Sequence, residues 1–186
     1  MYPTAARSVT LFEGLRKIDE DLASEAQKQG CPHCHGPLDR SAWLRKPRGF
    51  DLPEANRWRL GLCCRNCRTR VLPPSTLFWG RQVYWGAVVL VSVAVRQRRV
   101  EGWTARKLRE LFGVTAETLR RWIRMFEVEV PLSGRWARLR GRVSSEVRDD
   151  ALPDRLLALF DQKHGCGEAA LTAFLSFWAG VGFGAF

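Results

Sequence analysis

The chain has 186 residues, a formal net charge of +11 and a sequence pI near 10.1. This length allows one domain or two small ones, and the excess of positive charge favours a polyanionic partner. The first 20 residues carry six charged side chains, which excludes a secretory signal, and the longest uncharged runs fall short of a membrane span or barely reach one. We therefore expect a cytoplasmic protein with no membrane partner, in a compartment where thiols stay reduced.

The positive charge is concentrated in the middle of the chain. Residues 31–81 contain 10 basic and 3 acidic side chains, and residues 96–148 contain 14 basic and 6 acidic ones, whereas both ends have a small acidic excess. Arginine accounts for 25 of the 30 basic side chains. Because arginine can bind phosphate or guanine through two hydrogen bonds, this composition favours nucleic acid as the partner.

Residues 1–30 are predicted to form an N-terminal helical segment. Its helix occupies residues 9–29 and ends at Gly30, since glycine commonly follows the last helical residue. The apolar residues that recur at a helical spacing are Val9, Leu11, Phe12, Leu15, Ile18, Leu22 and Ala26.

Two cysteine pairs follow this helix, Cys31-Pro-His-Cys34 and Cys64-Arg-Asn-Cys67. In C-x2-C spacing two thiolates can bind one metal ion from one side, and two such pairs make the closed tetrahedral set typical of structural zinc. We therefore predict one structural zinc ion per chain, bound by Cys31, Cys34, Cys64 and Cys67. Four unligated thiols, or disulfides, are the alternative interpretation.

The second pair is ambiguous because either Cys63 or Cys64 could act with Cys67. The C-x2-C spacing favours Cys64, and Cys63 would then point to the opposite face of a strand, where it could enter the core. His33 and His35 flank the first pair, and we expect both to face solvent rather than to bind metal.

Residues 31–73 are predicted to form a small β zinc ribbon with short strands at residues 38–43 and 58–62. The gap between the two cysteine pairs is 29 residues, which is longer than the usual spacing. We therefore expect the ribbon to carry an insertion near residues 45–49.

Residues 74–130 are predicted to form a helical domain. Residues 73–76 have the composition of a hinge, in which Ser75 or Thr76 could cap a following helix. Residues 83–95 are apolar almost all round, which favours a buried helix, although their β-branched content leaves a strand as the alternative.

The end of this domain has the pattern of a helix-turn-helix. Thr104 can cap a short helix, Gly113 suits a left-handed turn, and Thr115 can cap a second helix that runs to Phe126. Arg109 departs from the pattern, since a small residue is usual at its position. The apolar faces of the two helices consist of Leu108, Leu111, Phe112, Leu119, Trp122, Ile123 and Phe126.

The opposite face of the second helix is basic. In a helix-turn-helix this face enters the major groove, where its N-terminal residues meet base edges or phosphates. An amphipathic helix with a solvated basic face, in which Glu117 and Arg121 pair at i, i+4, is the alternative interpretation. The sequence thus predicts a surface for double-stranded DNA that consists of Thr115, Ala116, Glu117, Arg120, Arg121 and Arg124.

Residues 131–186 are predicted to hold a basic segment and the C-terminal helices. Pro131 should end the second helix of the helix-turn-helix. Residues 135–142 could extend the contact with a DNA backbone or pack as a helix. Two apolar helices around residues 152–160 and 171–178 could close a core or form a dimerisation surface.

Together these elements predict an α+β fold that is mostly α, with a small β zinc ribbon, a helical domain containing a helix-turn-helix, and C-terminal helices. No nucleophile–base spacing stands out. Two-metal phosphoryl transfer needs carboxylates held by a sheet, whereas the acidic residues after the helix-turn-helix lie in helical sequence. We therefore expect no enzymatic activity.

The order of parts, from the two cysteine pairs through Arg70-Val-Leu-Pro-Pro-Ser-Thr-Leu-Phe to Leu108-Arg-Glu-Leu-Phe-Gly-Val-Thr-Ala-Glu-Thr-Leu-Arg-Arg-Trp, resembles the N-terminal DNA-binding region of insertion-sequence transposases. The resemblance covers residues 31–126. Such transposases continue into an RNase H-like catalytic domain with an acidic triad, and this chain stops too early for one. The resemblance therefore implies DNA binding linked to mobile elements, without strand transfer.

The leading hypothesis is a transposon-associated accessory or regulatory DNA-binding factor of the nucleoid. Its ribbon would be a second DNA contact, and its protein partner would be a second copy of the chain or the transposition machinery. The second hypothesis is a transcription regulator unrelated to mobile elements. The third is a zinc-stabilised module that binds RNA or an acidic protein.

Overall fold

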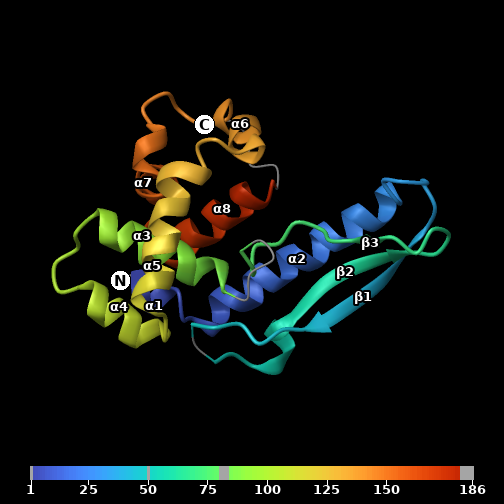
Figure 1. The fold of residues 1–186 in the computed structure, drawn as a ribbon, viewed down its shortest axis with the longest axis horizontal. Helices are drawn as coiled ribbons and strands as arrows, with labels where there is room; N and C mark the ends of the chain where they lie inside the picture. The colour runs from blue at the N-terminus through green and yellow to red at the C-terminus, as the bar shows by residue number, and fades with distance from the viewer. Residues whose placement is uncertain (1, 50, 80–83, 181–186) are drawn as a thin grey trace.

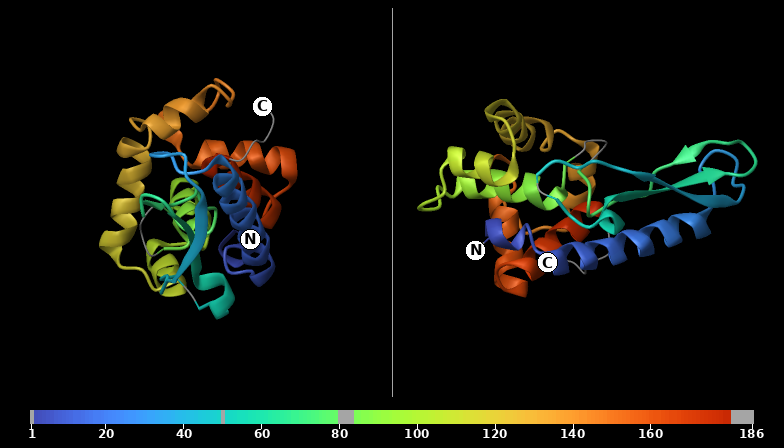
Figure 2. Two further views of the ribbon diagram at one scale, coloured as in Figure 1. Left: turned by 90° about the vertical axis from the view of Figure 1, so that its right-hand side faces the viewer. Right: turned by 90° about the horizontal axis from the view of Figure 1, so that it is seen from below.

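The computed structural model describes residues 2–49, 51–79 and 84–180 of the chain. A helical body lies at one end, and a β hairpin projects from it with one long helix alongside (Figure 1). The right-hand view of Figure 2 shows the same elongated shape, with the tip of the hairpin far from the C-terminal helices, whereas the left-hand view looks along the long axis. The predicted α+β class, mostly α, is confirmed. Among the described residues, no helix is both long enough and apolar enough to cross a membrane.

The long helix α2 (Val9–Gln29) joins the body to the hairpin. The Ser8 side chain caps its first turn by accepting a hydrogen bond from the Leu11 amide, and Gly30 ends it with a φ of 78°. Its bounds are those predicted, and its 21 residues rise about 30 Å. The first half buries Leu11, Phe12 and Leu15 in the body, and the second half packs on the sheet. The short helix α1 (Tyr2–Ala5), which was not predicted, precedes it.

The hairpin is a three-stranded antiparallel sheet of β1 (Leu38–Leu44), β2 (Trp58–Cys64) and β3 (Arg70–Val71) in the order β1-β2-β3. The register places Leu38 opposite Cys64. The first two strands lie where the sequence predicts them, with slightly later ends. The two-residue strand β3 was not predicted, because it is too short to show alternation.

The insertion between β1 and β2 returns to the body. It spans residues 45–57, includes the short 3-10 helix η1 (Glu54–Arg57), and buries Leu52 in the core of the body. A Cβ on Gly49 would lie 3.1 Å from the Val88 side chain, which shows how closely the insertion approaches α3. The insertion therefore anchors the base of the hairpin.

The centre of the body is α3 (Gly86–Gln97), in which every residue from Gly86 to Val95 is buried. The helical interpretation of this apolar run is confirmed from Gly86 onward, and Val83 lies outside the described residues. The remaining body elements are α4 (Ala105–Phe112), α5 (Ala116–Arg124), the π-helical turn η2 (Met125–Glu129), α6 (Gly134–Arg140), the 3-10 turn η3 (Asp149–Ala151), α7 (Asp154–His164) and α8 (Glu168–Ala179).

The two C-terminal helices α7 and α8 pack on each other and close the core of the body. Phe160 of α7 contacts Phe174 and Phe177 of α8 with ring centroids 5.7 Å apart in both pairs. Trp178 stacks on Trp79 at 5.1 Å. The predicted role of these helices in a core is therefore confirmed.

The segment between β3 and α3 differs from the prediction, because neither Ser75 nor Thr76 caps a helix. The next helix begins at Gly86, and its capping residue Trp85 makes no side-chain cap. Instead, the buried carboxylate of Asp19 in α2 accepts a hydrogen bond from the Ser75 hydroxyl, one from the Thr76 amide at 2.6 Å and one from the Thr76 hydroxyl at 2.8 Å. Burial raises the pKa of Asp19, and these hydrogen bonds oppose the rise.

Candidate metal centre and candidate nucleic-acid interface

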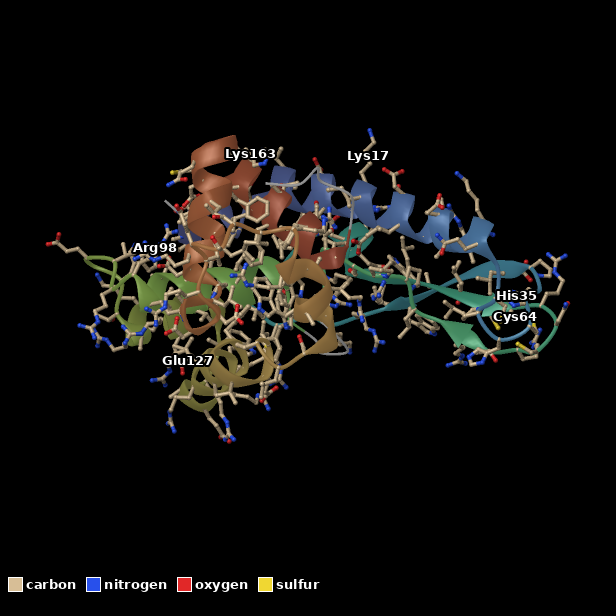
Figure 3. The ribbon with its side chains drawn as sticks, turned by 90° about the horizontal axis from the view of Figure 1, so that it is seen from above. Lys17, His35, Cys64, Arg98, Glu127 and Lys163 are labelled. Carbon is tan, nitrogen blue, oxygen red and sulfur yellow. The ribbon has the colours of Figure 1, made fainter. Side chains whose placement is uncertain are left out.

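The four predicted cysteines come together at the tip of the hairpin, where Figure 3 labels Cys64 and its neighbour His35. The sulfurs of Cys31 and Cys67 lie 3.6 Å apart, and those of Cys34 and Cys64 lie 3.5 Å apart. All four sulfurs lie within 4.8 Å of one another. Cys31 and Cys64 are buried, whereas Cys34 and Cys67 are exposed. This arrangement can hold a metal ion between the two turns.

The two cysteine turns have the same local conformation. In each, the residue after the second cysteine is left-handed, with a φ of 55° at His35 and 60° at Arg68. In each, an amide also approaches the first sulfur of the pair: His33 N lies 3.4 Å from the Cys31 sulfur, and Cys67 N lies 3.5 Å from the Cys64 sulfur. Amides at this distance favour thiolate over thiol.

Hydrogen bonds and neighbouring sulfurs shift the pKa values of two of these cysteines in opposite directions. The hydroxyl and the amide of Thr69 lower the pKa of Cys67 to about 6. The Gly36 amide favours the Cys34 thiolate, but the sulfurs of Cys64 and Cys67 outweigh it and raise the pKa of Cys34 to about 12. One thiolate therefore opposes the next, and a bound cation would relieve that repulsion.

Cys63 and the two histidines stand outside the cluster. Cys63 points to the face of the sheet away from Cys64, as predicted, but it does not enter the core. It is half-buried, and its sulfur lies 3.7 Å from the Arg68 carbonyl oxygen. His33 and His35 are exposed, as expected, and neither belongs to the group of potential metal ligands.

The second predicted site lies on α4, α5 and the turn between them. The Thr104 hydroxyl caps α4 by accepting from the Lys107 amide at 3.2 Å, and the Thr115 hydroxyl caps α5 by accepting from the Thr118 amide at 3.1 Å. Gly113 between the helices is left-handed, with φ 59° and ψ 29°. Local sequence signals thus place the start of both helices as predicted, whereas α5 ends at Arg124 rather than at Phe126, and the π-helical turn η2 continues from it.

The two faces of α5 separate apolar from basic side chains. Leu119 and Trp122 are buried, and the Trp122 ring meets Tyr84 edge to face with centroids 4.9 Å apart. Ala116 is half-buried. The other predicted contact residues, Thr115, Glu117, Arg120, Arg121 and Arg124, are exposed. Arg109 on α4 is also exposed, so its long side chain does not obstruct the packing of the two helices.

The arginines of α5 have no ion-pair partner in the part of the chain that the structure describes. Within residues 2–49, 51–79 and 84–180, none of Arg120, Arg121 and Arg124 forms an ion pair, and the alternative i, i+4 pair of Glu117 with Arg121 is not formed. Arg98 behaves differently, since it pairs with Asp154 and Asp161. The exposed charge on α5 is therefore available to an external anion.

The basic segment at residues 135–142 packs mainly as a helix. Trp136 and Leu139 of α6 are buried, and the Trp136 ring nitrogen donates to Asp149 at 2.9 Å. Arg140 donates to the carbonyl oxygens of Val143 and Ser144. These contacts use at least part of the positive charge of α6 inside the body.

Three residues with clear roles were missed in the sequence. Asp19 has no local signal, because its partners lie far along the chain. Thr69 follows the second cysteine pair and acts through its hydroxyl on Cys67 at 3.2 Å. Trp43 lies on the outer face of the sheet, beside Arg70.

Comparison of the chain with models of protein families, with curated proteins and with solved structures gave no match. Function must therefore be argued from the two sites themselves. They lie at opposite ends of the molecule, the cysteine cluster at the tip of the hairpin and α5 on the body (Figure 1).

Proposed function

We propose that this chain is a zinc-containing protein that binds double-stranded DNA through α5 as an accessory or regulatory factor. The observation that carries the proposal is the exposed face of α5. Its three arginines have no ion-pair partner among the described residues, and the opposite face of the same helix is fixed in the core. A rigid helix with uncompensated positive charge suits a polyanion.

The segment from α4 through Gly113 to α5 supports a helix-turn-helix. A short capped helix, a left-handed glycine and a second capped helix are the parts of this motif, and the third helix α3 supports both from behind. The major groove is about 12 Å wide and admits one helix. Arg120 and Arg121 would reach base edges, and Arg124, which lies further along, would contact phosphate.

Zinc is the metal that the donor set favours. Four sulfurs at about 2.3 Å from one zinc ion lie about 3.8 Å apart in a tetrahedron. The Cys34–Cys64 and Cys31–Cys67 sulfur distances, 3.5 and 3.6 Å, are close to that value. A closed set of four thiolates leaves no position for a substrate, so the metal would stabilise the hairpin rather than catalyse a reaction. Measuring metal content by elemental analysis would distinguish zinc from iron.

The association with mobile elements rests on the resemblance to the DNA-binding region of insertion-sequence transposases. It implies a location on the nucleoid and a partner in the transposition machinery or a second copy of the chain. A transcription regulator would use the same α5 surface. Genomic footprinting would separate the two, because a transposon-associated factor should occupy the ends of mobile elements rather than promoters.

The absence of catalysis forms part of the proposal, and it is supported by the contacts of the acidic residues after α5. Asp149 accepts from Trp136, Asp150 pairs with Arg148, and Asp154 pairs with Arg98. Carboxylates held in this way do not converge on a shared metal. Metal-dependent cleavage of a DNA substrate that is lost on replacing one of these aspartates would overturn this part of the proposal.

The direct test replaces Arg120, Arg121 and Arg124 with alanine. The fold should survive, because all three side chains are exposed. Each lost phosphate contact should lower the salt slope of binding by about one unit. Each lost guanine contact should cost about 1–3 kcal/mol and relax the preference at one base pair. Binding titrations across salt, with circular dichroism as the folding control, measure both effects.

A charge-matched control replaces Arg16, Lys17 and Lys28 on α2 with alanine. This variant loses the same formal charge from the opposite side of the molecule, where Figure 3 shows Lys17 pointing away from the sheet. We expect it to bind DNA nearly as well as the native chain. Equal affinities for the native chain and the α5 variant, with both folded, would reject α5 as the contact surface.

A further inference from the structure

The face of the hairpin away from α2 carries a second cluster of aromatic and basic side chains. The antiparallel register places Asp39 and Arg70 on either side of Cys63, so all three point to this outer face. Trp43 lies on the same face, because it is four residues from Asp39 along β1. Arg65 joins them through its ion pair with Asp39 at 2.7 Å.

Trp43 forms a flat surface at the centre of this cluster. A Cβ built on Gly61 of the neighbouring strand would lie only 2.1 Å from the Trp43 ring, so the indole lies directly over the glycine backbone. The Arg70 guanidinium stands 5.8 Å from the centroid of the same ring. A guanidinium that packs on an aromatic ring is held in place while its N–H donors stay available.

The charge of the hairpin is strongly positive. Residues 31–44 and 58–71, which form it, contain 5 basic side chains and 1 acidic side chain. Asp39, the acidic residue of the outer face, is neutralised by Arg65, whereas Arg68 and Arg70 form no ion pair within the described residues. Both are exposed. Two arginines are thus left to attract an anion.

The sheet of the hairpin and α5 lie on the same side of the molecule. In Figure 1 α5 and the sheet lie in front, with α2 behind the sheet. Figure 2 (right) confirms this, since α4 and α5 and the sheet lie on one side of the molecule and α2 lies on the other. In Figure 3 the Lys17 side of α2 and the Glu127 side of the body lie at opposite edges.

The length of α2, which joins the body to the hairpin, is close to the repeat of DNA. The 21 residues of α2 rise about 30 Å and carry the cysteine cluster out from the body. One turn of B-DNA is about 34 Å long, so a duplex that lies along the molecule would present its backbone again near the tip of the hairpin.

We propose that the outer face of the hairpin, through Arg68 and Arg70 with Trp43 as support, contacts the phosphates of the same duplex about one helical turn from α5. This inference rests on the proposed function and extends it to a second contact on the same duplex. The contact carries no base sequence information, because both arginines act as phosphate ligands. It lengthens the binding site and raises its salt dependence.

The experiment compares the native chain with the variant Arg68→Gln/Arg70→Gln on two duplexes, of about 12 and about 30 base pairs, around one target sequence. Glutamine keeps a polar side chain with N–H donors while it removes the charge. We expect the salt slope on the long duplex to fall by about two units and the slope on the short duplex to stay unchanged. Lys17→Ala/Lys28→Ala, which removes two charges from the far side, should change neither slope.

Metal content and circular dichroism verify that the variant keeps its hairpin. An unchanged slope on the long duplex, or an equal loss on both duplexes, would overturn the second contact. The proposed function fails separately, if the α5 triple variant binds both duplexes as the native chain does. In that case a loss with the hairpin variant would identify the hairpin as the principal contact.

Discussion

The hairpin and the helical body are stabilised in different ways. The body buries a large continuous core in which the biggest side chains, such as Trp85, Trp136 and Phe174, are almost wholly enclosed. Among the described residues, the small core at the tip of the hairpin consists of Cys31, Leu38, Leu62 and Cys64, with Ala26 and Val71 packed alongside. Burial at about 25 cal/mol per Å² of apolar surface can hold the body, whereas so few side chains cannot hold the tip without another source of stability. A metal ion held by the four sulfurs, as proposed above, would supply that stability.

Removing the metal should have the largest effect, and it should be confined to the hairpin. Structural zinc contributes about 10–16 kcal/mol of apparent binding free energy in small zinc-dependent folds. We expect Cys64→Ser, or chelation, to abolish metal binding and to unfold the tip of the hairpin. Trypsin should then cleave the chain at the hairpin arginines. The helical signal in circular dichroism should largely persist, because the body core does not include the cluster.

Cys63→Ser is the matched control for this prediction, because it makes the same change at the neighbouring residue. Cys63 lies on the outer face, and its sulfur approaches the Arg68 carbonyl oxygen rather than the cluster. The control should therefore keep its full metal content. A variant pair in which Cys63→Ser loses metal and Cys64→Ser retains it would show that the ligand assignment is wrong.

A substitution in the core of the body should lower the Tm and leave metal binding intact. Trp122 is buried and packs edge to face on Tyr84. Truncation to alanine should cost about 3–5 kcal/mol, as large aromatic truncations in cores do. Thermal denaturation should show a large fall in Tm, while the purified protein still binds metal below its new Tm.

Arg121→Ala is the control for Trp122→Ala. The Arg121 side chain is exposed, although the residue directly precedes Trp122 on α5. We expect the free energy of unfolding of this variant to stay within about 0.5 kcal/mol of the native value. If both substitutions lowered Tm equally, α5 would not have one buried and one exposed face.

The parts of the fold that could be predicted from sequence depend on local signals. Gly30 ends α2, Thr104 and Gly113 fix the two ends of α4, and Thr115 fixes the start of α5, because caps and left-handed turns act within a few residues. The cysteine spacing likewise brings each pair together in one turn.

The parts that could not be predicted depend on contacts between distant segments. Ser75 was expected to cap a helix, but its hydroxyl bonds to Asp19, which lies 56 residues away. The alternation of side chains along β2 predicts that Cys63 and Cys64 point to opposite faces of the sheet. It does not predict that α2 covers the face of Cys64 and leaves the face of Cys63 uncovered. Nor does the composition of the insertion show that Leu52 reaches the body core.

Asp19 connects the hairpin and the body, because it lies on α2 and binds Ser75 and Thr76 between β3 and α3. Of the changes at the metal site, at Trp122 and at Asp19, the change at Asp19 should have the smallest effect. Asp19→Ala would leave the Ser75 hydroxyl and the buried Thr76 amide without their acceptor, whereas the Thr76 hydroxyl can still donate to the Leu15 carbonyl oxygen. Groups left unsatisfied in this way cost about 1–3 kcal/mol. Asp19→Asn should cost less, because the amide oxygen can still accept from Thr76 while the amide nitrogen donates to Ser75.

The two variants also differ from the native chain in how their stability depends on pH. Burial raises the pKa of Asp19 above its ordinary value of 3.8, so the folded state favours the neutral acid. That contribution is fully present below pH 3.8 and is lost as pH rises through the folded-state pKa. Denaturation at pH values from 4 upward, each about half a unit apart, should show this loss in the native chain and not in Asp19→Asn. The contrary result is that the native chain becomes more stable relative to Asp19→Asn over that range. The hydrogen bonds and the nearby Arg59 would then outweigh burial, and Asp19 would be ionised in the folded state.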